Sequence, residues 1–388
     1  MYISESIKYI GVNDTKIDLF ESQYPVPDGM TYNSYVILDE KIAVMDTVEA
    51  DFVEQWHENM GVVLNGRTPD YLVIQHMEPD HSANIRYFMS SYPEAKIVAS
   101  EKAFTMIKNF FGTDYADRRI VVADGDTLSL GQHTLTFYTA PMVHWPEVIV
   151  TYDSFDKVLF SADGFGCFGY PNNIREWIPR GRRYYMGIVA KYGPQVQSLL
   201  KKLSGLDIQK ICSLHGAVID KSLDTCLKLY NTWSSYEPEE EGVVIAYTSI
   251  YGNTKKAVDL LVEKLRVQGE NNIVVYDLSR CDISLAVTDA FRYSTLILAT
   301  PTYNGDVFPF MKSFIEHLTE RNFQKRKVAF IENGSWAPTA AKVMASMLEK
   351  SKNLTYADTT VTIMSALKKE NILQIEDLAK EMGLSPQL

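Results

Sequence analysis

The chain has 388 residues, a length typical of two domains. Hydrophobic residues make up 46% of it and charged residues 22%, which excludes a disordered or fibrous protein. Its formal net charge of −11 makes it a poor general binder of nucleic acid or of anionic membranes. Residues 1–241 hold 21 basic and 33 acidic side chains, against 17 and 16 from residue 242 on. This uneven charge predicts two domains with different roles.

The chain start and the cysteines predict a cytoplasmic protein. The segment MYISESIKYI lacks the basic and apolar regions of a secretory signal, and no apolar run approaches the roughly 20 residues that span a bilayer. The cysteines are far apart and form no C-x-x-C pair, which argues against a rubredoxin-type iron site, a zinc knuckle or a disulfide framework. A reducing compartment is therefore expected.

Short strand-like runs broken by turn residues extend to about residue 230. Strands are expected at residues 34–38, 41–45, 71–74, 96–99, 119–123, 134–138 and 147–152. Helical stretches fall between some of them, at residues 51–60 and 193–203. Paired strands with helices outside them predict an α+β sandwich.

The polar segment SSYEPEEE, residues 234–241, cannot bury a face and is predicted to be a linker. We therefore expect one domain over residues 1–241 and a second over residues 242–388. In the second, strands are expected at residues 243–247, 272–276, 295–299, 327–331 and 356–362. Helices are expected at residues 254–268, 284–291, 308–320, 337–350 and 366–382. This alternation predicts a doubly wound α/β domain with a five-stranded parallel sheet, flavodoxin-like in size and order.

Potential metal ligands are crowded directly after the strand at residues 71–74. His76, Glu78, Asp80 and His81 lie within six residues of one another. Singly, a histidine or an Asp-His pair in a loop is usually structural. Crowded carboxylates, however, repel one another unless a cation neutralises them. The cluster therefore predicts a metal site.

Further candidate ligands end other strand-like runs, each followed closely by proline or glycine. They are His144, Asp163 and His215. The remaining histidines lie in helical or hairpin settings and are expected to be structural: His57, His133 and His317.

The order of these residues resembles the metallo-β-lactamase fold. In the zinc hydrolases of that fold the first motif is His-x-His-x-Asp-His, whereas this chain has Glu78 at the second histidine position. That substitution resembles the flavodiiron proteins, or A-type flavoproteins, which also carry a flavodoxin-like domain after the metal domain. The resemblance covers essentially the whole chain. It implies an αββα sandwich of the metallo-β-lactamase type followed by a flavodoxin-like domain.

The resemblance also implies a di-iron centre. One iron would be held by His76, Glu78 and His144, and the other by Asp80, His81 and His215, with Asp163 bridging the two. The histidine equivalent to His81 does not bind metal in every family member. Independently of the family, mixed imidazole and carboxylate ligands suit iron that cycles between its ferrous and ferric states.

A phosphate cradle is predicted after the strand at residues 243–247, where hydroxyls and a glycine open a helix. Two more loops follow the third and fourth strands and should converge with it at the same sheet edge. An ordinary helix cap and surface aromatic residues in turns are the alternatives. The candidate cofactor residues are Thr248, Ser249, Tyr251, Gly252, Asn253, Thr254, Pro301, Thr302, Tyr303, Asn304, Gly305, Asn333, Gly334, Ser335 and Trp336.

Tyr303 and Trp336 could stack on an isoalloxazine ring. The three loops resemble those of flavodoxin, which implies FMN. No G-x-G-x-x-G motif occurs in this domain, which argues against direct binding of FAD or NAD.

The resemblance implies an oxygen and/or nitric oxide reductase, in which electrons pass from FMN to the di-iron centre and reduce O₂ to water or NO to N₂O. It further implies a head-to-tail homodimer and a separate electron donor, rubredoxin or a reduced deazaflavin. Trp145 and Tyr192 are candidate side chains of the gas pocket. The basic run at residues 321–327, RNFQKRK, is a candidate docking patch for an acidic donor, with a solvated helix end as the alternative.

A zinc-dependent hydrolase with a flavodoxin-like appendage is the alternative function. Glu78 and the FMN-type loops argue against it. A redox-inactive scaffold is disfavoured because every expected ligand is present.

Overall fold

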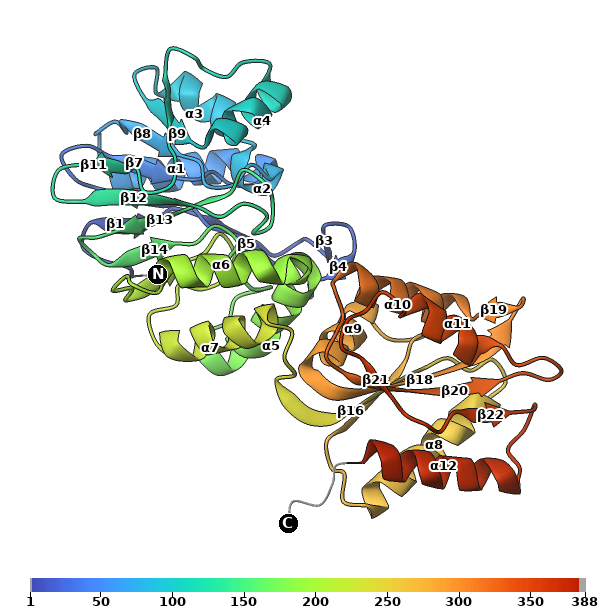
Figure 1. Cartoon of the computed structure of the whole chain (residues 1–388). Helices are drawn as coiled ribbons and strands as arrows, with labels where there is room; N and C mark the ends of the chain where they lie inside the picture. Colours follow the sequence, from blue (N-terminus) through green and yellow to red (C-terminus); the bar gives the residue numbers. More distant parts are fainter. Residues whose placement is uncertain (1, 384–388) are drawn as a thin grey trace. The chain divides into compact units, whose positions relative to one another are not determined.

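A computed structural model describes residues 2–383 of the chain, which divides into two compact units, Met1–Asn231 and Thr232–Leu388 (Figure 1). The expected linker at residues 234–241 is short in the structure. Helix α7 (Leu223–Ser234) extends to the first residue of the expected linker, and strand β16 (Glu240–Tyr247) includes its last two residues. The indole of Trp233, in the last turn of α7, donates a hydrogen bond of 2.8 Å to the carboxylate of Glu239, which precedes β16.

The first unit contains two facing β-sheets. One has the order β1 (Ile7–Tyr9), β6 (Tyr35–Ile37), β7 (Ala43–Met45), β8 (Tyr71–Val73), β9 (Lys96–Ala99) and β10 (Arg119–Val121). The other has the order β11 (Thr127–Ser129), β12 (Thr134–Thr139), β13 (Ile149–Asp153), β14 (Val158–Phe160) and β15 (Lys210–Cys212). Apolar side chains from both sheets form one buried core, among them Tyr35, Val73, Phe137 and Phe160.

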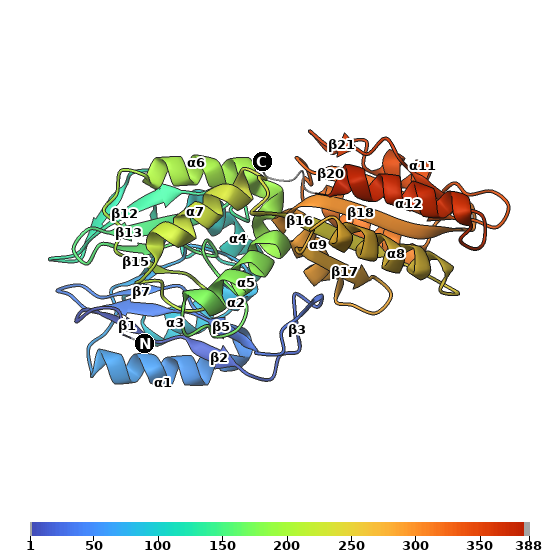
Figure 2. The ribbon, with the colours of Figure 1, turned by 90° about the horizontal axis from the view of Figure 1, so that it is seen from below.

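Helices cover the outer faces of this sandwich. Helix α1 (Val53–Leu64) lies against the first sheet, and α6 (Gly193–Leu203) and α7 lie against the second (Figure 2). Helices α3 (Ile85–Ser91), α4 (Glu101–Phe111) and α5 (Ile174–Tyr184) complete the layers. The predicted αββα sandwich is confirmed. The helix expected at residues 51–60 begins instead as a 3₁₀ turn, Ala50–Phe52.

Two small two-stranded sheets are formed by the segment between β1 and β6. Strand β2 (Val12–Asp14) pairs with β5 (Met30–Tyr32), and β3 (Leu19–Phe20) pairs with β4 (Tyr24–Pro25) to form a short hairpin. Strands β7, β8 and β9 run parallel, as do β14 and β15. The loops that leave β7 and β8 therefore share one edge of their sheet, and those that leave β14 and β15 share one edge of theirs.

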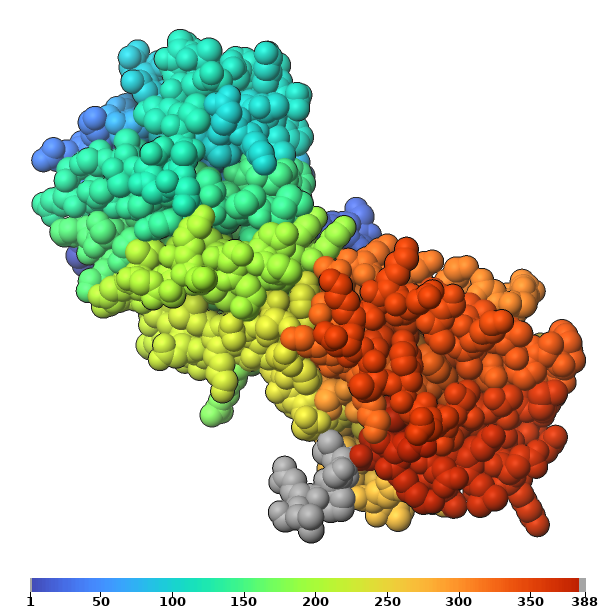
Figure 3. Space-filling view, viewed as in Figure 1, coloured from blue at the N-terminus to red at the C-terminus, as the bar shows by residue number. Residues whose placement is uncertain are grey.

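The second unit is a parallel sheet in the order β17 (Ile273–Asp277), β16, β18 (Tyr293–Tyr303), β20 (Lys327–Asn333) and β21 (Thr355–Tyr356). Helices α8 (Asn253–Val267) and α12 (Lys369–Met382) cover one face (Figure 1). Helices α9 (Ile283–Arg292), α10 (Pro309–Glu320) and α11 (Ala340–Met347) cover the other. The predicted flavodoxin-like fold is confirmed. In the space-filling view, α12 lies at the surface of this unit (Figure 3).

The fifth strand differs from the prediction at residues 356–362, because it is interrupted. Strand β22 (Val361–Ile363) continues the pairing with β20 after a gap. In that gap the Glu381 carboxylate accepts hydrogen bonds from the backbone N–H groups of Asp358 (2.8 Å) and Thr359 (3.2 Å). These N–H groups are therefore taken from the ladder by α12. A short strand β19 (Asp306–Val307) also pairs antiparallel to β18. None of the helices described over residues 2–383 is both long and apolar enough to cross a bilayer.

Candidate metal and flavin sites

All seven predicted metal ligands come together in the first unit. Their ligand atoms form two groups, and within each group the atoms lie within 4.8 Å of one another. The first group consists of His76, Glu78, His144 and Asp163, and the second of Asp80, His81 and His215. They come from the loops after β8, β12, β14 and β15 and from α2 (Pro79–Ser82).

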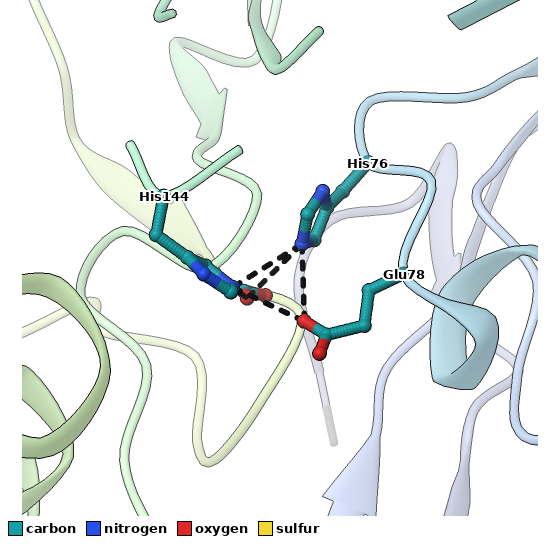
Figure 4. A group of neighbouring side chains, drawn as sticks. His76, Glu78 and His144 are labelled. Atoms are coloured by element: carbon teal, nitrogen blue, oxygen red, sulfur yellow. Dashed lines mark hydrogen bonds and ion pairs between the residues drawn. The ribbon is translucent and has the colours of Figure 1, made fainter. Parts of the chain in front are cut away.

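In the first group three side chains point toward one centre (Figure 4). His76 Nε2 lies 3.2 Å from Glu78 Oε2 and 3.3 Å from His144 Nε2. His144 Nε2 lies 3.1 Å from the same Glu78 oxygen. Three ligand atoms of two chemical kinds therefore face a common point.

Asp163 stands between the two groups. Its Oδ2 lies 3.0 Å from His144 Nε2, and its Oδ1 lies 3.4 Å from His81 Nε2. In the second group, His215 Nε2 lies 3.1 Å from His81 Nε2 and 3.3 Å from Asp80 Oδ2. One oxygen of Asp163 thus faces each group, which is the geometry that a bridging carboxylate requires.

The donor set fits two first-row metal ions. Ligands about 2.1 Å from an ion lie about 3.0–3.4 Å from each other in octahedral or tetrahedral geometry, the spacing found here. Among the described residues, both oxygens of Asp80 and Oδ1 of Asp163 are buried without a hydrogen-bond partner. Buried carboxylate oxygens without donors are costly, and a cation removes that cost.

The charges of the site are strongly coupled. Burial alone would lower the pKa of His144, but hydrogen bonds with Asp163 and Glu78 outweigh it and raise this pKa to about 9. Burial would raise the pKa of Glu78, yet hydrogen bonds with His144 and His76 lower it. In the metal-free protein, protons on the imidazoles take the place that metal ions would hold.

Three supporting residues have no role in the sequence-based prediction. Glu147 Oε1 lies 2.8 Å from His76 Nδ1 and accepts the Met77 N–H at 2.9 Å. The His215 ring donates from Nδ1 to the Thr31 carbonyl at 2.7 Å. Such bonds fix a ring so that its other nitrogen faces the metal. Glu147 follows His144 closely in the sequence, which was an available signal, whereas nothing in the sequence pointed to Thr31.

Asp46 is the third supporting residue. It follows β7 and is fully buried, and its Oδ1 accepts the backbone N–H of Gln75 at 2.7 Å while its Oδ2 accepts the Gln75 side-chain amide at 2.9 Å. Burial raises the pKa of Asp46 to about 6, although the hydrogen bonds from Gln75 oppose this. Asp46 therefore holds the start of the loop that carries His76.

His81 differs from His76 and His215 in the hydrogen bonding of its Nδ1 atom. Its Nδ1 is buried and has no hydrogen-bond partner among residues 2–383. The corresponding nitrogens of His76 and His215 both have one. His81 is therefore the least firmly oriented of these three rings.

Aromatic rings surround the ligands. The Trp145 ring lies 5.3 Å from the His76 ring, so this candidate pocket residue is next to the site. The rings of Phe20 and Tyr184 lie 5.3 and 5.6 Å from the His215 ring. Tyr192, the other candidate, is the residue just before α6, and its side chain makes no capping hydrogen bond there.

The histidines expected to be structural lie outside the two groups. His133 Nδ1 lies 2.9 Å from Asp153 Oδ2. The ring of His57 packs 5.3 Å from the Tyr87 ring. His317, in the last turn of α10, has its Nδ1 3.2 Å from the Arg321 guanidinium.

A pocket of ≈ 730 Å³ lies in the second unit, beyond the carboxyl ends of β16, β18 and β20. Eleven of the predicted cofactor residues line it: Tyr251, Asn253, Pro301, Thr302, Tyr303, Asn304, Gly305, Asn333, Gly334, Ser335 and Trp336. The residues Tyr251 and Trp336 are 91% and 89% exposed. Large exposed rings beside a pocket suit a planar aromatic ligand, and the start of α8 offers backbone N–H groups for a phosphate.

Four predicted cofactor residues do not line this pocket. Thr248 and Thr254 are buried, and the Thr248 hydroxyl pairs with that of Thr300 at 2.7 Å. Ser249 accepts the Gly252 N–H at 3.1 Å and so closes the turn before α8, with Gly252 in the left-handed region. The lining also includes residues that the sequence did not point to: Ile250, Phe308, Ala337, Thr339 and Ser365.

The basic run at residues 321–327 is largely engaged within the protein. Arg326 is buried, and its guanidinium donates to the Tyr236 carbonyl at 2.7 Å. Lys325 pairs with Glu237 and donates to the Ser235 carbonyl at 2.9 Å. The run is therefore not simply a solvated helix end.

Comparison with known proteins supports both halves of this description. A family model described as ODP family beta lactamase matches residues 30–216, and one described as a flavodoxin domain matches residues 244–371. Rubredoxin-oxygen oxidoreductase of Megalodesulfovibrio gigas is 29% identical over 89% of this chain and 88% of its own length. The anaerobic nitric oxide reductase flavorubredoxin of Salmonella arizonae is 26% identical over 89% of this chain and 74% of its own.

A solved structure shows the same arrangement of elements. Rubredoxin oxygen:oxidoreductase from Desulfovibrio gigas matches with a TM-score of 0.92 and 26% identity, over 98% of this chain and 97% of that one. The fold and the ligand cluster define an oxidoreductase that combines a β-lactamase-type metal domain with a flavodoxin domain. The chain belongs to the flavodiiron proteins, and its cofactors are FMN and a di-iron centre.

Proposed function

We propose that this protein reduces O₂ to water or NO to N₂O. The observation that carries the proposal is the pair of ligand groups joined by Asp163, whose two oxygens face His144 and His81. Two metal ions held this close can bind and reduce one small gas together. The relatives named for rubredoxin-oxygen oxidoreductase and nitric oxide reductase activities support both substrates.

We assign the ligands as the family resemblance implies. His76, Glu78 and His144 would hold one iron, Asp80, His81 and His215 the other, and Asp163 both. When bound, the irons and FMN supply the electrons that the gas accepts. Glu147 and Thr31 hold the His76 and His215 rings in the orientation that ligation requires. The rings of Phe20, Tyr184 and Trp145 pack beside the His215 and His76 rings and would give the site an apolar wall.

For the flavin unit we propose that all of the predicted loop residues contribute to FMN binding. The residues that line the pocket would contact the cofactor directly. Ser249 and Gly252 would act by shaping the turn that precedes α8, and Thr248 and Thr254 by anchoring it from the buried side. Tyr303 and Trp336 would stack on the isoalloxazine ring.

The proposed assembly is a head-to-tail homodimer or a dimer of dimers in the cytoplasm, reduced by a separate donor. Rubredoxin is the favoured donor because the Megalodesulfovibrio gigas relative is named rubredoxin-oxygen oxidoreductase. A reduced deazaflavin is the alternative. The four cysteines are all free, which suits a reducing compartment.

Metal and flavin analysis tests the proposal first. Iron and FMN in the purified protein are expected, and zinc without flavin would instead support the hydrolase. The decisive experiment is anaerobic reduction followed by parallel measurements of O₂ and NO consumption with the same donor. Consumption of neither gas by the iron- and FMN-loaded protein would refute the proposed function.

A further inference from the structure

We propose that O₂ or NO reaches the metal site through an apolar cavity beneath α6, and that Leu199 separates this cavity from a pocket at the surface. The inference rests on the proposed function. Six of the seven ligand residues are buried, so most of the site is reached only between side chains of the protein. Both gases are small and nearly apolar, so an apolar cavity takes them up more readily than it takes up water.

The cavity lies between α6 and the second sheet of the first unit. Its volume of ≈ 10 Å³ leaves room for a single small molecule. Apolar side chains of α6, β13 and β14 form most of its wall: Val150, Leu159, Val196, Leu199, Leu200 and Leu203. The other face of α6 is exposed, with Ser198 and Lys202 among its residues. One helix therefore separates the cavity from solvent.

The two hydroxyl groups in the wall are already hydrogen-bonded within the protein. The Ser161 hydroxyl donates to the Gly164 carbonyl at 2.6 Å, and the Tyr230 hydroxyl accepts the N–H of Phe165. The Phe165 and Tyr230 rings are stacked, with centroids 4.0 Å apart. A buried water needs about two to four polar partners, which hydroxyls bonded in this way do not supply. The cavity is therefore expected to stay dry and to accept an apolar gas.

The inner end of the cavity belongs to the loops that carry two of the metal ligands. Val143, which precedes His144, lines it, and so do Gly164 and Phe165, which follow Asp163. Phe165 has a left-handed backbone conformation, with φ of 65°, which is costly for an aromatic residue. The loop thus keeps an aromatic ring in the cavity wall at an energetic cost. A gas molecule in the cavity is one residue away from His144 and from the bridging carboxylate.

The outer end of the cavity is closed by Leu199. This buried side chain lines both the cavity and a surface pocket of ≈ 320 Å³, whose wall also contains Ala140, Pro141, Pro194 and Lys202. A leucine side chain can change rotamer without movement of the helix backbone. Rotation of Leu199 would therefore join the pocket to the cavity for one small molecule at a time.

The kinetic test compares Leu199→Trp with Leu199→Ala and with Val62→Trp, which places the same ring on α1 at a residue that is 83% exposed. Leu199→Trp fills the entrance. The second-order rate constant for the reaction of the reduced, iron- and FMN-loaded protein with O₂ or NO is expected to fall about tenfold, with kcat unchanged. Iron and FMN contents should not change. Leu199→Ala should retain at least the wild-type rate constant, and Val62→Trp should match the wild type.

Krypton, a small apolar atom, tests the cavity without any reaction. Crystals of the oxidised, iron- and FMN-loaded protein under krypton pressure should show a krypton atom among Phe165, Val196 and Leu199. Leu199→Trp should show none there, and Leu199→Ala should show a higher occupancy, because its cavity is larger. The comparison of wild type with Leu199→Ala decides the question even where Leu199→Trp is unstable.

Three outcomes would overturn the inference. The first is a wild type with no krypton at this position. The second is an unchanged rate constant in Leu199→Trp, which would place gas entry at the partly exposed Glu78. The third is an equal loss of kcat and kcat/KM in Leu199→Trp, which would assign Leu199 a structural role. A wild type that takes up krypton but consumes neither gas would instead refute the proposed function, and the route would lose its substrate.

Discussion

Asp163 is the residue on which both ligand groups depend, because one of its oxygens faces each of them. We predict that Asp163→Asn lowers iron content to one ion or fewer per chain and abolishes gas reduction, since an amide nitrogen cannot replace the second oxygen. FMN content should not change. Iron analysis and flavin absorbance measure the two effects, with Asp117→Asn, an exposed aspartate, as the control. Full iron content and activity in Asp163→Asn would refute the bridging role.

His144 makes metal binding depend on pH. Its pKa is about 9 in the metal-free protein, above the ordinary value of 6.5, so at lower pH a metal ion must displace the proton. We predict that zinc, a redox-silent probe, binds the metal-free protein more tightly as pH rises from about 7 to about 9. The gain is about tenfold per pH unit for each proton displaced. Competition titrations and proton release in weak buffer measure it. Binding with no release of protons would contradict the prediction.

The sequence predicted the ligands better than it predicted their supports. His76, Glu78, Asp80 and His81 are crowded in one segment, and crowding of charge is visible in a sequence. Asp46 and Thr31 act through hydrogen bonds with residues far along the chain, such as Thr31 with His215. These pairings depend on sheet register and helix packing, which no local pattern encodes.

At the scale of the element, the loop after β15 depends on one glycine. Gly216 has φ of +85°, and a Cβ atom there would lie 2.3 Å from Cys167 Sγ. We predict that Gly216→Ala destabilises the first unit by at least about 2 kcal/mol and lowers iron content, because His215 is adjacent. Thermal unfolding and iron analysis test this. Gly205→Ala, where a Cβ meets nothing within 4 Å, is the matched control and should leave both unchanged.

The start of α11 is capped by a residue from another loop. The Thr302 hydroxyl accepts the N–H groups of Thr339 (2.9 Å) and Ala340 (3.2 Å), while Thr339 itself makes no side-chain cap. We predict that Thr302→Val costs about 1 kcal/mol of stability and weakens FMN binding, because two loops of the pocket lose their connection. Thr302→Ser should retain both properties. Flavin fluorescence titration measures the affinity, and equal affinities in the two variants would contradict the prediction.

The elements with strong periodicity were predicted well and the irregular ones were not. Residues 193–203 and 96–99 coincide with α6 and β9, where apolar spacing or β-branched residues act locally. The interruption between β21 and β22 could not be predicted, because it depends on Glu381 from α12. Local sequence sets where a strand begins, but a distant carboxylate decides whether it continues.

For the whole molecule, the uneven charge has a partial physical cause. Glu78, Asp80 and Asp163 are assigned to cations, so the metal-loaded first unit is less acidic than its sequence suggests. Some of the remaining acidic side chains are buried and paired, as Asp46 and Glu147 are. In the near-neutral second unit, Arg326 and Lys325 of the basic run at residues 321–327 bind the backbone carbonyls of Tyr236 and Ser235, and Lys325 also pairs with Glu237. Reversal of charge at Lys325 would therefore disturb local structure as well as any donor docking.

The two units have separate cores and separate cofactor sites, so removal of one cofactor should act on one unit. We predict that chelation of iron lowers the unfolding temperature of the first unit and leaves the flavin absorbance of the second unchanged. Bound metal at about 100 times its Kd contributes about 2.7 kcal/mol, so the shift should amount to several degrees. Calorimetry with and without chelator, followed at the flavin band, measures both. Release of FMN on chelation alone would show that the units are coupled and would refute the prediction.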